Sequence, residues 1–292
     1  MAQTGVSGTP FGFLFLEGNM DDNVKKKLSG SSEDVIRRVM GFRLLDDDFM
    51  KAVFDDCKPA ASVVLRVILN KPDLVVDSVS ADVPVINFGN RSIRVDVLAR
   101  ENDKIYNIEI QRADRGASPK RARYHGSLLD ADELEKGSDF DKLPETYVIF
   151  ITENDIYDKG LPMYQYERSC IETGEQLGDG QHIIYVNGKH RGDDPVGNLM
   201  HDFACTSAVD MHYNELAERV RYFKETEEGF ASMCRSVEEL VEKYEAKGRA
   251  EGADRLGRLI TKLLRQNRMD DVQKVSVDSA FREKLYKELG IA

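Results

Sequence analysis

The fold class that the sequence predicts is an α/β sandwich with a mixed sheet. Apolar residues recur at helical spacing up to Pro72, and β-branched, alternating residues follow it. The resulting order of a helix, three strands, a helix and a strand is typical of a sheet covered by helices. With 292 residues and 41% apolar content, the chain is long enough for one sizeable core and an accessory segment.

The predicted elements are set by caps, prolines and side-chain periodicity. Acidic residues precede Phe49, Val53 and Phe54 and indicate the start of a helix at 44–49, because the positive end of the helix dipole favours acids. Pro59 should end that helix and open another. Strands are expected near 74–80, 92–100, 105–111 and 147–152, a helix at about 119–135, and a further pair of strands at 163–171 and 182–187.

Three segments are predicted along the chain. Residues 1–40 mix Gly, Ser and Asn with a short basic run and suggest a partly disordered lead-in. Residues 41–230 hold the α/β domain, and 231–292 form a helical C-terminal segment with amphipathic stripes that are typical of packing. The two glycines of 247–252 fall where a long helix would weaken, and they predict a linker.

Composition limits the possible compartment and partners. No stretch approaches the roughly 18 consecutive apolar residues of a membrane span, and four widely spaced cysteines form no CxxC pair. We therefore expect a cytoplasmic protein that does not associate with membranes; a homo-oligomer is compatible with the sequence. The net charge of -11 opposes general adhesion to DNA, so any nucleic-acid site must be local.

One such local patch lies between Arg112 and Arg123. It holds five basic side chains and one acid within an acidic protein. A solvated helix start is the simpler interpretation of such a patch taken alone.

The candidate catalytic residues lie on a predicted β-hairpin. Alternating runs flank Asn102-Asp103, which predicts a turn there, and closing that turn pairs Glu101 with Lys104. Each further step outward keeps this register, so Asp96 falls opposite Glu109. One face should then hold Val95, Val97, Ala99, Tyr106, Ile108 and Ile110, and the other Arg94, Asp96, Asn107, Glu109 and Gln111.

Opposed carboxylates on paired strands repel each other, so a purely structural sheet has little reason to keep them. A divalent cation between Asp96 and Glu109 would remove the repulsion. Such an ion can hold a phosphodiester and activate a water. The alternative interpretation is an exposed hairpin whose acids face water, or a register two residues away.

The spacing of these residues resembles a known signature. Asp96, followed after thirteen residues by Glu109-Ile110-Gln111, is similar to the PD-(D/E)xK motif, and 41–155 resemble the recombination-promoting nuclease and putative transposase family of that superfamily. Further matches are the run from Asp48 to Phe54, the run from Tyr106 to Gln111, and the run from Arg121 to Tyr124.

The resemblance implies a restriction-endonuclease-like core, with order αβββαβ, and an endonuclease that cleaves DNA with Mg²⁺ or Mn²⁺. Asp96 and Glu109 would be the metal ligands, Gln111 a catalytic residue, and Asp48 an auxiliary acid. Asp48 has an equally good interpretation as a helix cap, and Asp46 or Asp47 could replace it. The residues expected to contact DNA are Lys51, Arg112, Lys120, Arg121, Arg123 and Tyr124, although Lys51 fits a solvated lysine and Tyr124 a core tyrosine as well.

The sequence departs from the superfamily pattern at Gln111, where lysine is common. Glutamine can orient a water but supplies no positive charge, and Arg112 or Arg121 could supply it instead. The function expected is phosphodiester hydrolysis in recombination or mobile DNA. The alternative is a catalytically inactive nuclease-fold module that binds DNA or protein.

A zinc site is the weaker metal hypothesis. His201, Cys205 and His212 could be ligands on one helix face, but the sequence offers no fourth ligand at a sensible spacing.

Overall fold

The computed structural model describes residues 33–112, 116–266, 268, 271–272, 274–275 and 278–291. They form two compact units, which divide between Met233 and Cys234. The predicted lead-in at 1–32 lies outside the described residues. Residues 33–40, which we had placed in that lead-in, belong to a helix, α3 (Glu33–Gly41).

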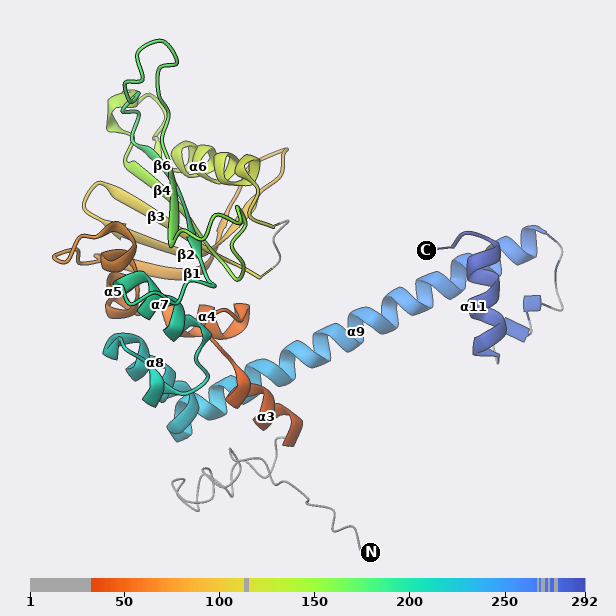
Figure 1. Cartoon of the computed structure of the whole chain (residues 1–292). Coiled ribbons are helices and arrows are strands. Elements are labelled where there is room, and N and C mark those ends of the chain that lie inside the picture. The colour runs from red at the N-terminus through yellow and green to blue at the C-terminus, as the bar shows by residue number, and fades with distance from the viewer. Residues whose placement is uncertain are drawn as a thin grey trace, which may run out of the picture. The chain divides into compact units, whose positions relative to one another are not determined.

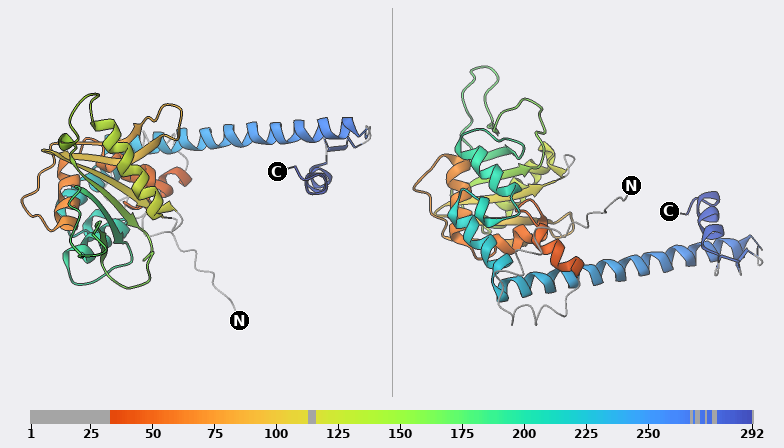
Figure 2. Two further views of the ribbon diagram at one scale, coloured as in Figure 1. Left: turned by 90° about the horizontal axis from the view of Figure 1, so that it is seen from above. Right: turned by 60° about the horizontal axis from the view of Figure 1, so that its bottom comes forward.

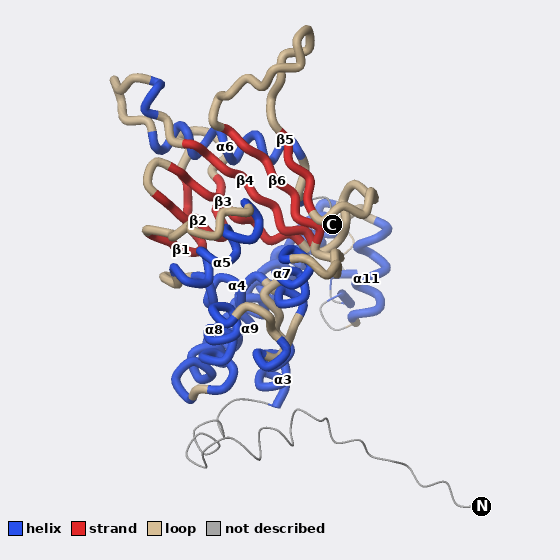
Figure 3. The backbone as a smooth tube through the Cα atoms, turned by 60° about the vertical axis from the view of Figure 1, so that its left-hand side comes forward, coloured by secondary structure: helices blue, strands red, loops and turns tan. Residues whose placement is uncertain are grey.

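The first unit contains a mixed six-stranded sheet in the order β1-β2-β3-β4-β6-β5 (Figure 3). The central pairs β3–β4 and β4–β6 are parallel, and the remaining pairs are antiparallel. This confirms the predicted α/β class with a mixed sheet. The strands are β1 (Ser78–Val85), β2 (Ile93–Glu101), β3 (Lys104–Gln111), β4 (Glu145–Thr152), β5 (Met163–Tyr166) and β6 (Gln181–Asn187).

Helices cover the sheet on both sides (Figure 1). α6 packs along β4 and reaches β1 and β6, α4 and α5 pack on β1, and α7 and α8 pack against α5. The helices of this unit are α4 (Asp47–Phe54), α5 (Lys58–Leu69), α6 (Pro119–Glu133), α7 (Pro195–Ala204) and α8 (Asn214–Glu225), with short turns η3 (Phe140–Lys142) and η4 (Ala208–Asp210).

The first strand begins later than predicted. Leu74 and Val76 are buried, as their pattern suggested, but the backbone N–H of Val76 donates to Ser62 Oγ of α5. This segment is therefore anchored to a helix, and pairing with β2 begins only at Ser78.

The C-terminal unit is helical. α9 (Glu227–Arg265) continues without a break through 247–252, so the predicted linker is wrong (Figure 2). Each glycine costs a helix about 1 kcal/mol, and the exposed pairs Lys247–Glu251 and Glu245–Arg249, worth about 0.2–0.5 kcal/mol each, offset part of that cost. The predicted stripes pack together: Leu259 and Leu263 join Leu285 of α11 (Ser279–Glu288) in an apolar cluster. No helix among the described residues has the length and apolarity needed to cross a bilayer.

Candidate active site

The β2–β3 hairpin has the predicted register. Glu101 pairs with Lys104 across the turn, and the pairing continues step by step to Val97 opposite Ile108. Asn102 takes the left-handed conformation (φ +52°) that a tight hairpin turn needs, which asparagine tolerates better than most residues. The next step outward brings Asp96 level with Glu109, as the sequence predicted.

The two carboxylates lie between the strands at this step. The backbone N–H of Asp96 donates to Glu109 Oε1 (3.4 Å), and the backbone N–H of Ile110 donates to Asp96 Oδ2 (3.0 Å). Each carboxylate therefore accepts a hydrogen bond from a backbone N–H that would donate to a carbonyl of the neighbouring strand in a regular ladder. The hairpin opens at its acids instead of closing over them.

The alternation of faces also breaks at Asp96. Val95 and Leu98, three residues apart, join the same apolar cluster with Leu128 and Leu129 of α6, although such spacing places side chains on opposite faces of a regular strand. The expectation that Val95 shares a face with Val97 and Ala99 is therefore wrong.

In β1, Asp82 lies level with Asp96 between the paired residues Ala81 and Val83, and it has a φ of +56°. Local irregularities of this kind bend a sheet and redirect side chains, and they are frequent beside active sites. Both edges of β2 are thus distorted at the level of Asp96.

Glu109 is held by α6. Its side chain is 1% exposed, and Arg121 Nη2 donates to its Oε2 at 2.7 Å. His125 Nδ1 lies 3.4 Å from Oε1, and Arg121 Nε donates to the same ring at Nε2 (3.2 Å). A buried carboxylate is tolerated only when charge and hydrogen bonds compensate its desolvation, and Arg121 supplies both.

Asp96 is in a less favourable environment. Burial, followed by the neighbouring charge of Glu109, raises the pKa of Asp96 to about 7. Asp47 of α4 adds to this increase, and Lys51 opposes it. The negative charges near Asp96 outweigh the positive charge of Lys51, so a cation bound there would be stabilised.

The start of α4 lies beside this pair of acids. Asp46 is the N-cap residue of α4 and its side chain makes no capping bond, so the alternative of Asp48 as the cap is wrong. Burial, then Asp47, raises the pKa of Asp48. Lys51 Nζ bonds Asp47 (3.0 Å) and Asp82 (3.1 Å), so this predicted DNA contact is paired with acids, and it is not the freely solvated lysine that we considered as its alternative.

Gln111 is fixed by the loop that leads into α6. Arg121 Nη1 donates to Gln111 Oε1 (2.8 Å) and to the carbonyl of Gly116 (3.1 Å). A Cβ atom on Gly116 would lie 2.0 Å from Gln111 Cδ, so any larger residue at this position would displace the end of the Gln111 side chain. Of the two arginines proposed to replace the missing lysine charge, Arg121 contacts Gln111, whereas Arg112 pairs with Asp46 and Glu153.

The part of the chain that holds these residues is similar to a known family. Residues 87–190 match the model of the PD-(D/E)XK nuclease family transposases. This segment of the chain is similar to that family. No curated protein and no solved structure matches the chain. The predicted resemblance is thereby confirmed, and the six-stranded sheet with flanking helices is consistent with a restriction-endonuclease-like fold that has strands β5 and β6 added to the predicted αβββαβ core.

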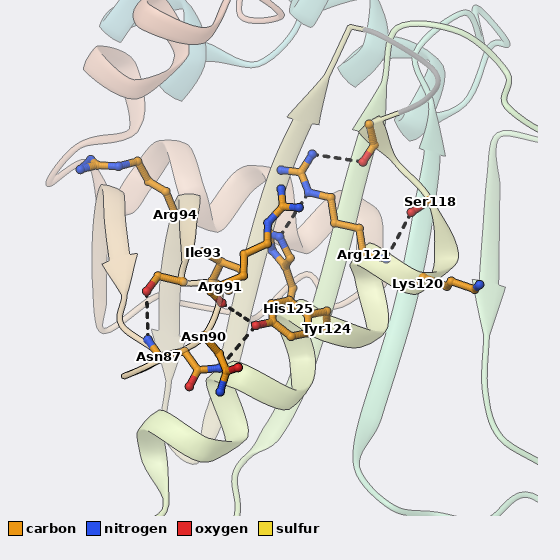
Figure 4. Close-up of a pocket in the computed structure, with 12 residues that line it drawn as sticks. Asn87, Asn90, Arg91, Ile93, Arg94, Ser118, Lys120, Arg121, Tyr124 and His125 are labelled. Atoms are coloured by element: carbon orange, nitrogen blue, oxygen red, sulfur yellow. Dashed lines mark hydrogen bonds between the residues drawn. The ribbon is translucent and has the colours of Figure 1, made fainter.

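The matched segment includes Asp96, Glu109, Gln111 and α6. It also contains a pocket of about 1050 Å³ on the α6 side of the hairpin (Figure 4). Among the described residues that line the pocket there are four cations and no acid. The lining residues are Asn87, Asn90, Arg91, Ser92, Ile93, Arg94, Gly116, Ser118, Lys120, Arg121, Tyr124 and His125.

The predicted DNA-contact residues divide into two groups. Lys120, Arg121 and Tyr124 line the pocket, and Arg123 is exposed on the same helix. Tyr124 is half-buried there, with its hydroxyl bonded to the carbonyl of Arg91, so it is not the core tyrosine that we considered as an alternative.

Lys51 and Arg112 form the second group, because Lys51 pairs with Asp47 and Asp82, and Arg112 pairs with Asp46 and Glu153. Arg115 of the predicted basic patch lies outside the described residues. The basic residues available to bind DNA thus lie on α6 and the β1–β2 turn, and not at Arg112 as the sequence predicted.

The β1–β2 turn is the part of the pocket that the sequence analysis missed. It contributes Asn87, Asn90 and Arg91, and Phe88 within it is 92% exposed. The signal was available, since an aromatic residue between asparagines and arginines in a turn is unusual for a structural loop. Its distance in sequence from the 112–123 patch concealed the connection.

Proposed function

We propose that this protein is a divalent-metal-dependent DNA endonuclease of the transposase-associated PD-(D/E)xK type. The observation that carries the proposal is the pair of acids Asp96 and Glu109 between opened strands, beside Arg121 and Gln111. The family of the matched domain supports phosphodiester hydrolysis as the reaction and DNA as the substrate.

The donor set fits Mg²⁺ or Mn²⁺. Asp96 and Glu109 offer carboxylate oxygens, the ligands that hard divalent ions prefer. The raised pKa of Asp96 has burial and Glu109 as its leading causes, and a bound cation would counteract both. Asp48, at the start of α4, would act as an auxiliary acid that completes the negative field.

The ion, when bound by Asp96 and Glu109, would lower the pKa of a water ligand and neutralise charge on the phosphate. Arg121 would direct positive charge to the attacked phosphate, because it is anchored on the same carboxylate. Gln111, oriented by Arg121, would position the water or the phosphate. The charge expected from a lysine in the motif would thus come from α6.

The basic pocket would hold the DNA backbone next to the acids. Arg91 and Lys120 add to Arg121 in lining it, and Arg94, which pairs with Asp82, lies at the same pocket. Contacts to phosphates carry little sequence information, so we expect low sequence specificity. Phe88 at the β1–β2 turn would stack on an exposed base, an interaction that every base can make. A role in recombination or mobile DNA rests on the family match.

Plasmid nicking tests the proposal. Purified protein with Mg²⁺ or Mn²⁺ should nick supercoiled DNA, and Asp96→Asn should abolish nicking while circular dichroism shows an unchanged fold. Asp103→Asn, in the turn of the same hairpin, is the matched control and should retain activity. Equal behaviour of wild type and Asp96→Asn would instead identify a catalytically inactive module that binds DNA or protein.

A further inference from the structure

A second cluster of potential ligands lies at the end of α7, apart from the hairpin residues. His201 and Asp202 occupy the last turn of α7, Cys205 caps its C-terminus, and His212 lies on the segment that leads into α8. The sequence had placed His201, Cys205 and His212 on one helix face, which is wrong because α7 ends at Ala204. Tertiary folding brings them together, and the two imidazole centroids are 4.6 Å apart.

Asp202 is the centre of this cluster. Its side chain is 0% exposed, and its Oδ1 lies 3.1 Å from His212 Nδ1 and 3.4 Å from His201 Nδ1. Cys205 Sγ lies 3.5 Å from His201 Nδ1. Asp202 is the acidic ligand that the sequence analysis did not find, because it considered only histidine and cysteine.

Three of the distances between these atoms match edges of a tetrahedral metal site. With bonds of about 2.0–2.1 Å to nitrogen or oxygen and about 2.3 Å to sulfur, tetrahedral ligands lie about 3.3 Å apart, or about 3.6 Å where one is sulfur. The two Nδ1–Oδ1 distances and the Sγ–Nδ1 distance fall at these values. The ligand atoms of His201, Asp202 and His212 all lie within 4.8 Å of one another.

The carboxylate is also pre-oriented, as metal ligands usually are. The backbone N–H of His212 donates to Asp202 Oδ1 (2.8 Å), and that of Tyr213 donates to Oδ2 (2.8 Å). Hydrogen bonds of this kind hold a ligand in place and tune its basicity. They also mean that the carboxylate needs no imidazole to compensate its burial, yet two imidazole nitrogens converge on one of its oxygens.

We propose that His201, Asp202 and His212 bind a transition-metal ion of the Zn²⁺ class, and that the Cys205 thiol, which now lies beside His201, turns toward the ion as the fourth ligand. Two nitrogens, one oxygen and one sulfur suit Zn²⁺ and exclude Mg²⁺ as the preferred ion. The site joins the end of α7 to the start of α8 and therefore serves the fold and not the cleavage reaction. It is independent of the nuclease proposal.

Metal titration of the full chain tests this site. Protein freed of metal with a chelator is titrated with Co²⁺ and Zn²⁺ in excess Mg²⁺, which competes for carboxylates but not for imidazole or thiolate. We expect one equivalent of Co²⁺ to give an intense tetrahedral visible spectrum with a thiolate charge-transfer band. Cys205→Ser should remove that band, and His212→Gln should weaken Zn²⁺ binding at least about tenfold.

His190→Ala is the matched control, because His190 also pairs with an aspartate but lies before α7. It should leave both titrations unchanged. His212→Gln retains the backbone N–H that Asp202 accepts, and circular dichroism confirms that it folds. Absence of a stoichiometric site in the wild type, or Zn²⁺ affinity that His212→Gln and Cys205→Ser leave unaltered, would overturn the proposal and leave Asp202 as a hydrogen-bonded cap only.

Discussion

Two buried carboxylates, Glu109 in the hairpin and Asp202 at the end of α7, solve the same problem by different means. Their side chains are 1% and 0% exposed. Glu109 is compensated by a charged side chain, Arg121, whereas Asp202 accepts the backbone N–H groups of His212 and Tyr213. A side chain can move away and be replaced by another cation, but a backbone donor cannot leave without unfolding.

The neighbouring side chains of the two carboxylates also differ in charge. Glu109 has a second acid, Asp96, as its neighbour, and this pair repels. Asp202 has the imidazoles of His201 and His212 as its neighbours, and neither of them carries a negative charge. The hairpin therefore holds a repelling pair of acids, whereas the α7 cluster surrounds its acid with hydrogen-bond donors.

Exchanging each carboxylate for its amide should give the largest contrast. Glu109→Gln should lower DNA cleavage by about 10²- to 10³-fold with little loss of stability, because it also relieves the repulsion with Asp96. Asp202→Asn should cost about 2 kcal/mol of unfolding free energy, because two buried N–H groups lose a charged acceptor. Nicking assays and urea denaturation measure the two effects, and the comparison is broken if Asp202→Asn is as stable as the wild type.

Removing Arg121 tests whether the compensating charge at Glu109 is exchangeable. Arg121→Leu should lower cleavage at saturating Mg²⁺ by about 10- to 100-fold. It should also lower the Mg²⁺ concentration needed for half-maximal activity, because the ion no longer competes with the guanidinium for Glu109. Arg123→Leu, exposed on the same helix, is the control. An unchanged Mg²⁺ requirement would mean that Arg121 and the ion do not share Glu109.

A single methyl group added at Gly116 should displace the side chain of Gln111 in the candidate site. Gly116→Ala places a Cβ against the side chain of Gln111 and should lower cleavage about tenfold, since small misplacements of a catalytic group are costly. Gly41→Ala, where a Cβ meets nothing within 4 Å, should leave the rate unchanged. Equal rates for both variants would show that the position of Gln111 is unimportant.

The smallest effect concerns stability without metal. The folded state raises the pKa of Asp96, so the stability linked to its proton is complete below the unfolded value near 3.9 and is lost as pH rises through the folded value. Asp96→Asn should therefore be about 1–2 kcal/mol more stable than the wild type at pH 8, and the difference should shrink at pH 5. Thermal unfolding in chelator measures it. A difference that does not depend on pH would contradict the repulsion at the hairpin.

Features that depend on residues close together in the chain could be predicted from the sequence alone. The Asn102-Asp103 turn and the alternation around it fixed the register that places Asp96 level with Glu109, and cap and proline signals located α4, α5 and α6. Such features follow from contacts a few residues apart, which periodicity and turn chemistry report directly.

Contacts between side chains far apart in the sequence could not be predicted, because they depend on the tertiary structure. Arg121 on Glu109, the β1–β2 turn in the basic pocket and Asp202 between two histidines all depend on how helices dock on the sheet. The face change at Val95 depends on distortions of two strands at once. One-dimensional patterns specify which face of an element is buried, but the angle and offset of packing are set by the summed side-chain volumes of both partners, which no single segment contains.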